Sequence, residues 1–362
     1  MKISKNTSNR IISLDILRIL AGLAVVSIHV SDSFVGYKNI FGGITWFIAN
    51  YINSTARISV PLFVMISGYL IISRYRENNL FAFLTKRFFR LILPFVFWTV
   101  FFFFWPYWFF GAKLNLVSSL RDFLNSTNTH LYFLVIILEL SLLTPLLSSF
   151  FKKSTVQNQK YFLVLTFLFS ITVTLINLFF PFSAYKENIL TKSLLYIGYY
   201  CAGYFLVEKR IFFNKKKLLV GVFAFSAIAN GIFNFLTTDL DNSKVSFLWS
   251  KGFNQYFFGP FSPFIVLMTV SLFLIFVSTD FAGKLNRFSE KAVIHLSSVI
   301  FGIYLIHPIF IDLADKFAGL RIDKILSPLW FFLILKIIIV FFLSYFTVNL
   351  LKSIPLTKQL VS

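Results

Sequence analysis

Long hydrophobic runs alternate with short polar segments along the whole chain of 362 residues. A membrane-spanning helix needs about 20 mostly apolar residues, because the hydrocarbon core of a bilayer is about 30 Å thick. By this criterion the pattern predicts ten spans, at residues 11–31, 44–73, 88–110, 131–151, 161–181, 193–208, 218–236, 258–279, 293–313 and 328–351. We therefore predict an all-α fold, a polytopic transmembrane helical bundle, with residues 1–362 as one integral membrane domain.

Two of the predicted spans depart from the simple pattern. Residues 44–73 are too many for one plain span, and the stretch begins with the polar residues Asn50, Asn53 and Ser54. Residues 44–56 could therefore form a separate interfacial segment. The span at 193–208 is short for a membrane crossing.

Composition supports a membrane protein and argues against a nucleic-acid-binding one. Hydrophobic residues make up 57% of the chain and charged residues only 13%, whereas a soluble domain has roughly 25% charged residues. The net charge of +20 comes from short clusters of Lys and Arg. These clusters gather in alternate loops, which predicts that both termini are cytoplasmic.

Several chemistries have no support in the sequence. The single cysteine, Cys201, lies in an apolar run, and the four histidines are scattered. There is no HExxH metal pair, no Walker-type phosphate loop and no GxSxG nucleophile elbow. We expect no metal site.

The first span carries three ionisable residues on one stripe. At about 100° per residue, Arg18 and His29 lie within about 20° of each other, and Asp15 is about 40° away. Asp15 and Arg18 could simply neutralise each other as an i,i+3 pair. His29 could be an interfacial histidine bound to water, or a general base, since its intrinsic pKa suits proton transfer from a hydroxyl.

A basic cluster precedes the third span. Arg87 and Arg90 are three residues apart and would share a helix face near the beginning of the helix, with Lys86 and Arg74 close in sequence. Guanidinium groups match phosphate oxygens, and a helix N-terminus favours anions. The alternative is a cytoplasmic topology signal without further function.

Polar residues in later spans are further candidates. His130 begins the fourth span, and Glu139 lies inside it, either as a partner of a cation or as an inert protonated acid. In the ninth span Tyr304 is followed by His307, which precedes Pro308 and is expected to close the helix.

Arg57 is a further candidate, expected toward the outer face. It could pair there with an anionic lipid-linked acceptor or with a carboxylate.

Five motifs, taken together, resemble membrane acyltransferase family 3. They are LDILR followed by a histidine in the first span, RISVPLFVMISGYL, KRFFRLILP, HLYFL and FGIYLIHP, and they occur in the family's order over nearly the whole chain. The resemblance implies ten spans with cytoplasmic ends in a bacterial inner membrane. It also implies an acyl-CoA donor, such as acetyl-CoA, and O-acylation of an envelope glycan on the outer side.

The resemblance also assigns roles to individual residues. The family's first-span Arg and His fall on Arg18 and His29, its RxxR donor motif on Arg87 and Arg90, and its histidine before the fourth span on His130. Many members carry an acidic pair after that histidine, whereas this chain has only Glu139.

These expectations combine into one hypothesis for the reaction. Arg87 and Arg90, with Lys86 and Arg74, hold the donor phosphates. His29 deprotonates the acceptor hydroxyl, and Asp15 and Arg18 hold in place the helix face on which His29 lies. Glu139 is a further catalytic candidate. His130, Arg57, Tyr304 and His307 line the acceptor side. The expected partners are acyl-CoA, a lipid-linked envelope glycan and membrane lipids, while the oligomeric state stays open.

Two alternatives remain at this point. His29 could itself be transiently acylated. A protein of a different class, a transporter or flippase of lipid-linked glycans, could use the same residues to bind its cargo.

Overall fold

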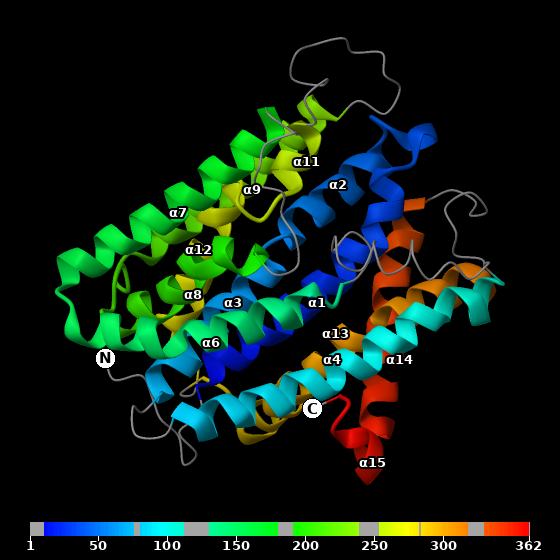
Figure 1. Cartoon of the computed structure of the whole chain (residues 1–362). Helices are drawn as coiled ribbons and strands as arrows, with labels where there is room; N and C mark the ends of the chain where they lie inside the picture. Colours follow the sequence, from blue (N-terminus) through cyan, green and yellow to red (C-terminus); the bar gives the residue numbers. More distant parts are fainter. Residues whose placement is uncertain are drawn as a thin grey trace.

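The computed structural model describes residues 11–75, 80–111, 130–179, 191–238, 253–281, 284–317 and 329–361, and within these ranges it contains helices and no strand. This confirms the all-α prediction. The helices form one elongated bundle (Figure 1). They are α1 (Ile12–Val35), η1 (Lys38–Ile40), α2 (Ile44–Ala56), α3 (Ser59–Arg74), α4 (Leu80–Phe110), α6 (Tyr132–Lys153), α7 (Val156–Phe179), α8 (Lys192–Glu208), α9 (Lys216–Thr237), α11 (Phe253–Phe258), α12 (Pro263–Val277), α13 (Arg287–Phe317), α14 (Leu329–Ser353) and α15 (Pro355–Lys358).

The predicted spans correspond to helices of the bundle. Among the described residues, nine helical segments are long and apolar enough to cross a membrane, one of them being α2 and α3 taken together. The predicted short span is α8, which has 17 residues and is buried along almost its whole length. Its neighbours, rather than lipid, therefore surround it.

Three predicted boundaries were wrong or incomplete. The stretch 44–73 is two helices, so residues 44–56 do form a separate segment as predicted; it is not interfacial, however, because Asn50, Asn53 and Ser54 are buried in the bundle. Helix α4 begins at Leu80, eight residues earlier than expected. Helix α13 does not close at His307 but continues through Pro308 to Phe317.

The break between α2 and α3 has a local cause. Proline is tolerated in the first turn of a helix, where its missing N–H has no intrahelical partner, and Pro61 lies in the first turn of α3. Pro61 therefore cannot donate to the carbonyl oxygen of Arg57, four residues earlier, and Arg57 and Ile58 connect two helices.

Helices α3 and α8 cross at very short range. A Cβ atom on Gly68 would lie 1.9 Å from the carbonyl oxygen of Tyr200, and one on Gly203 would lie 2.0 Å from that of Met65. Small residues allow such close approach, which is a common device for packing helices in lipid. These two glycines therefore set the short distance between the backbones of α3 and α8.

Helix α1 lies inside the bundle and packs against α2, α3 and α13, while α13 packs against α14. After α14 the chain turns back through α15. Trp98 of α4 donates a hydrogen bond from Nε1 to the carbonyl oxygen of Leu360 at 2.9 Å, and Val361 is fully buried. The C-terminal segment thus lies beside α4 (Figure 1).

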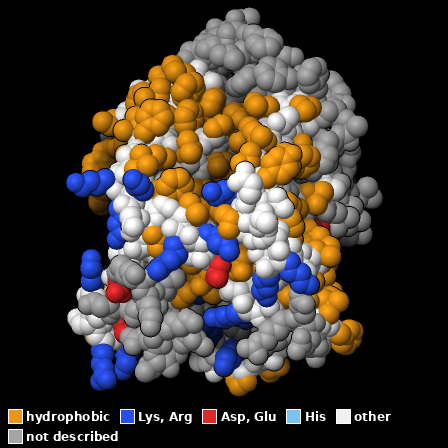
Figure 2. Space-filling model, turned by 90° about the vertical axis from the view of Figure 1, so that its left-hand side faces the viewer, with side chains coloured by type: hydrophobic (Ala, Val, Ile, Leu, Met, Phe, Trp, Pro, Cys, Tyr) orange, Lys and Arg blue, Asp and Glu red, His pale blue; other side chains and the backbone are white. Residues whose placement is uncertain are grey.

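The outer surface is largely apolar. Many Phe and Leu side chains of α4, α7, α9 and α14 are exposed, among them Phe89, Leu168, Phe225 and Phe346. In the face drawn in Figure 2, hydrophobic side chains cover the upper part and Lys and Arg gather lower down. Lipid would cover such an apolar belt, with the charged groups toward one end.

Candidate active site

A cavity of about 530 Å³ lies between α1, α3, α4, α6, α13 and α14. Five basic side chains from four helices line it: Arg18, Arg74, Arg87, Arg90 and Lys352. Cations that converge from separate helices repel one another, so their arrangement suits an anion with several negative groups. We call this region the basic end of the cavity.

Arg87 and Arg90 face the cavity from one side of α4, as their spacing predicts. They lie in the second and third turns of α4, because the helix begins at Leu80. The expected help from a helix N-terminus is therefore weaker than predicted, since that effect falls off after the first turn. The side chain of Lys86 lies outside the described residues.

Lys352, in the last turn of α14, is a basic residue of this cavity that the sequence analysis missed. Its Nζ atom donates a hydrogen bond to the carbonyl oxygen of Ser298 at 2.8 Å, which holds the ammonium group at the cavity wall. Ser67, Ser297 and Ser298 also line the cavity. In the sequence Lys352 is simply a cation after the last apolar run, which is typical of a topology signal.

Asp15 and Arg18 form the i,i+3 ion pair that the sequence allowed, with 2.8 Å between Nη1 and Oδ1. Ser297 of α13 donates a second hydrogen bond to the same Asp15 oxygen at 2.7 Å. Asp15 is buried, whereas Arg18 lines the cavity. Asp15 therefore joins α1 to α13 and orients Arg18, and it does not itself face the cavity.

Three histidines from distant parts of the chain meet beyond the basic end. The ring centroid of His307 lies 5.1 Å from that of His29 and 5.3 Å from that of His130. The rings of His29 and His130 are 6.5 Å apart. His307 is fully buried, and His29 is exposed at the edge of the cluster. We call these three residues the histidine cluster.

Tyr304 connects the cavity to the histidine cluster. Its side chain lines the cavity, and its ring centroid is 5.6 Å from that of His130. The Tyr304 hydroxyl donates to the carbonyl oxygen of His130, and His130 Nε2 donates to the carbonyl oxygen of Leu305 at 3.0 Å. These two bonds hold the turn that carries His130 against α13.

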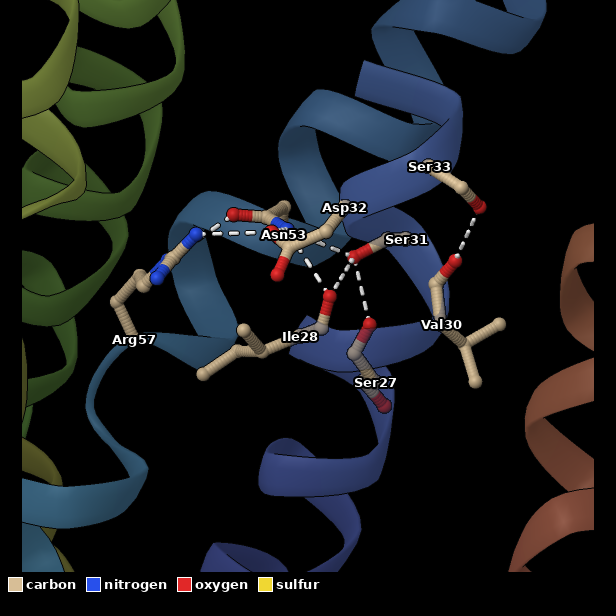
Figure 3. A network of polar contacts seen from close by, with 8 residues as sticks. All are labelled: Ser27, Ile28, Val30, Ser31, Asp32, Ser33, Asn53 and Arg57. Carbon is tan, nitrogen blue, oxygen red and sulfur yellow. Dashed lines mark hydrogen bonds and ion pairs between the residues drawn. The ribbon is translucent and has the colours of Figure 1, made fainter. Parts of the chain in front are cut away.

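A polar network lies one turn beyond His29 on α1 (Figure 3). Asn53 of α2 donates from Nδ2 to the carbonyl oxygen of Ile28 at 3.2 Å and to Asp32 at 2.7 Å. Arg57 donates to the same Asp32 oxygen from Nη2 at 2.9 Å and to Asn53 Oδ1 from Nε at 3.1 Å. Arg57 was expected to pair with an anionic acceptor or with a carboxylate, and it pairs with the carboxylate of Asp32.

This network places Arg57 near His29, on the exposed side of the bundle. The side chains of Arg57 and Asp32 are 29% and 46% exposed, so a ligand can reach both. Asp32 and the role of Asn53 were not predicted from the sequence. An available signal was the acid one turn after His29, because residues three apart share a helix face.

Glu139 is not brought together with the other candidates. It lies on α6, does not line the cavity, and has one buried carboxylate oxygen that finds no hydrogen-bond partner within the described part of the chain. Its predicted catalytic role stays a prediction. Among the described residues, no group of three His, Cys, Asp or Glu side chains has a geometry that could hold a metal ion.

One comparison with known proteins identifies a relationship. The model of a family described as an acyltransferase domain matches residues 11–349. No curated protein and no solved structure gives a significant match to the chain. The matched part contains every candidate described above except Lys352.

Proposed function

The chain belongs to membrane acyltransferase family 3, and from this premise we propose that it moves an acyl group, such as acetyl, from acyl-CoA to a hydroxyl of a cell-envelope glycan. The chain would act in the bacterial inner membrane with both termini in the cytoplasm. A lipid-linked glycan is the expected acceptor. The reaction would be an O-acylation that joins substrates from opposite sides of the membrane.

The observation that carries this proposal is the continuity between the basic end of the cavity and the histidine cluster. The wall that contains Arg87 and Arg90 also contains Tyr304, which contacts His130. Along α1, Arg18 and His29 are eleven residues apart, which corresponds to about 16 Å. An extended pantetheine arm has a comparable length, so phosphates held at the basic end would leave a thioester near His29.

The basic side chains would bind the donor through its phosphates. Arg74, Arg87 and Arg90 offer planar forks that match phosphate oxygens, and Lys352 adds a point charge. Arg18 is held by Asp15 at the same basic end, where it would neutralise further phosphate charge. The apolar lining, including Phe63, Leu70 and Phe133, suits the uncharged pantetheine arm.

The transfer itself needs a base near the acceptor. His29 would take the proton of the acceptor hydroxyl as its oxygen attacks the thioester carbon. The new C–O bond forms, the C–S bond breaks, and the proton passes from His29 to the leaving sulfur. Asp32 and Arg57 lie on the exposed side of His29, where carboxylate and guanidinium groups would bind sugar hydroxyls.

The proposal is tested by a His29→Ala variant of the purified protein in lipid vesicles. We expect its rate of acyl transfer from labelled acetyl-CoA to isolated envelope glycan to fall by about 10²–10⁴-fold, since general-base help contributes about that much. Release of free CoA measures consumption of the thioester. His295→Ala is the matched control, because His295 is an exposed histidine outside the cluster.

Two results would contradict the proposal. A folded His29→Ala variant that acylates at the native rate would remove His29 from the chemistry. Movement of lipid-linked glycan across the vesicle membrane without release of CoA would instead support a transporter or flippase. A trapped acyl-His29 would replace direct transfer by a two-step route.

A further inference from the structure

The pair His307–Pro308 creates an unusual hydrogen bond within α13. Proline has no backbone N–H, so Pro308 cannot donate to the carbonyl oxygen of Tyr304, four residues earlier in the helix. His307 supplies the missing donor, because its Nδ1 atom lies 2.7 Å from that oxygen. A carbonyl oxygen only accepts, so Nδ1 carries the proton.

This bond decides what the other ring nitrogen of His307 can do. With the proton on Nδ1, the neutral ring has its lone pair on Nε2. That Nε2 atom is buried and has no hydrogen-bond partner among the described residues. The proline thus turns His307 into a buried acceptor with a fixed direction.

The neighbouring histidines differ in what they can donate. The one N–H of neutral His130 is already used, because its Nε2 donates to the carbonyl oxygen of Leu305 at 3.0 Å. His29 is the other ring in contact, and its centroid is 5.1 Å from that of His307. Two imidazoles joined by an N–H···N bond of about 2.9 Å have centroids about 5 Å apart.

We propose that His307 is a positioning residue for His29, accepting a hydrogen bond at Nε2 from the N–H of the His29 ring. The other nitrogen of His29 then carries the lone pair and faces the exposed side of the cluster. The structure has the two rings in contact without this hydrogen bond, which a rotation of the exposed His29 ring would form. The role of His29 in this inference rests on the proposed function, whereas the pairing rests on the ring contact and on the unpartnered Nε2 atom.

The pairing assigns the proton at each stage of the transfer. The outer nitrogen of His29 takes the proton of the acceptor hydroxyl while the C–O bond forms and the C–S bond breaks. The inner N–H stays on the hydrogen bond to His307, which remains neutral. His29 then returns the acquired proton to the thiolate, so no net charge is left in the cluster.

The surroundings of His29 contain few other ionisable groups. Asp32 and Arg57 act on it from the exposed side, and His130 and His307 pack against it. Asp32 already accepts hydrogen bonds from Asn53 and Arg57. The lone pair of His307 Nε2 is buried without a donor within the described residues, and the His307 ring lies nearer to His29 than the His130 ring does.

Two substitutions at His307 separate the pairing from a structural role. The amide of Asn occupies the place of Nδ1 and can still donate to the carbonyl of Tyr304, but it has nothing at the place of Nε2. The amide of Gln reaches the place of Nε2 and offers an acceptor oxygen there. We expect kcat to fall about 10²-fold in His307→Asn and less than about tenfold in His307→Gln, with an unchanged KM for acetyl-CoA.

A purely structural role predicts the reverse order, because only Asn preserves the bond to Tyr304. Equal losses in the two variants, or a larger loss in His307→Gln, would overturn the proposal. His295→Asn and His295→Gln are the matched controls on the same helix, since His295 is exposed.

Pro308→Ala tests the same pairing from the other side. Alanine restores the backbone N–H that donates to the Tyr304 carbonyl oxygen. This N–H competes with His307 Nδ1 for that oxygen, so the His307 ring becomes free to turn. We expect a higher melting temperature together with a kcat reduced about tenfold. An unchanged kcat would mean that the orientation of His307 does not matter, and would overturn the proposal.

A chemical readout keeps this inference separate from the proposed function. Diethyl pyrocarbonate acylates neutral imidazoles, and an accepting partner on the far nitrogen makes His29 a better nucleophile. We expect the rate of His29 modification, followed by mass spectrometry, to fall severalfold in His307→Asn and to persist in His307→Gln. This pattern in a protein without acyl transfer would leave the pairing intact and remove only the function; equal rates would remove the pairing.

Discussion

At the scale of single residues, hydrogen bonds to backbone carbonyl oxygens orient the polar side chains of the bundle. Lys352 is held by the carbonyl of Ser298, His130 by that of Leu305 and His307 by that of Tyr304. A polar group away from water needs such a partner, because an unsatisfied one is costly in lipid. The functional groups therefore have fixed directions in the folded bundle.

Lys352 gives a prediction at this scale. Lys352→Met keeps the length of the side chain and removes its charge, so we expect the KM for acyl-CoA to rise about fivefold to tenfold with little change in kcat. A charge contact of about 1 kcal/mol corresponds to this loss. The measurement is initial rate against acyl-CoA concentration.

Lys358→Met is the control for Lys352, because Lys358 is an exposed lysine on α15 outside the cavity. An equal change of KM in the two variants would assign the effect to the general positive charge of this end. No change at Lys352 would exclude it from donor binding.

At the scale of the elements, the crossing of α3 and α8 holds the wall of the cavity in place. Helix α3 contributes Phe63, Ser67, Leu70 and Arg74 to that wall, and Gly68 lies among them on the face toward α8. The distance of 1.9 Å between a Cβ on Gly68 and the Tyr200 oxygen means that any larger residue must push the two backbones apart.

Gly68→Ala is therefore expected to destabilise the bundle by about 1–3 kcal/mol, the usual cost of overpacking. Thermal or denaturant unfolding of the detergent-solubilised protein measures this. Gly221→Ala is the matched control, because nothing lies within 4 Å of a Cβ at that position on α9. We expect it to be neutral or stabilising, since Ala is a better helix former than Gly.

A loss of stability shared by both glycine variants would show that the close crossing of α3 and α8 does not govern the effect. A native-like Gly68→Ala protein would mean that α3 and α8 can separate without cost.

At the scale of the whole molecule, polar groups line a route through an apolar bundle. The basic end and the histidine cluster are joined by Tyr304, and the surface around them is largely apolar. Under the proposed function, such a route would let a charged donor and a polar acceptor approach one point without either crossing the hydrocarbon.

Labelling from each side of the membrane tests this route. In a Cys201→Ala background, Ser298→Cys lies at the basic end and Ser33→Cys lies near the other end of α1, and both serines are exposed. We expect a membrane-impermeant thiol reagent to modify Ser33→Cys from outside intact cells and Ser298→Cys only after the inner face is opened. Added CoA should slow modification of Ser298→Cys alone; labelling of both from one side would contradict the arrangement.

Much of the fold followed from the sequence, since the hydrophobic runs are long enough to span a bilayer whatever they pack against. The pairs within one helix were also predictable: Asp15 with Arg18, and Arg87 beside Arg90, share faces by helical geometry alone.

Only the tertiary structure determined which residues from different helices contact one another. His130 contacts Leu305 across 175 residues, and Lys352 reaches a cavity whose other cations come from the first four helices. The continuation of α13 through Pro308, by contrast, has a local cause, because the side chain of the preceding residue, His307, supplies a donor to the Tyr304 carbonyl in place of the missing backbone N–H. Periodicity within the sequence determines the face of a helix on which a residue lies, and only the packing of the helices determines what that face touches.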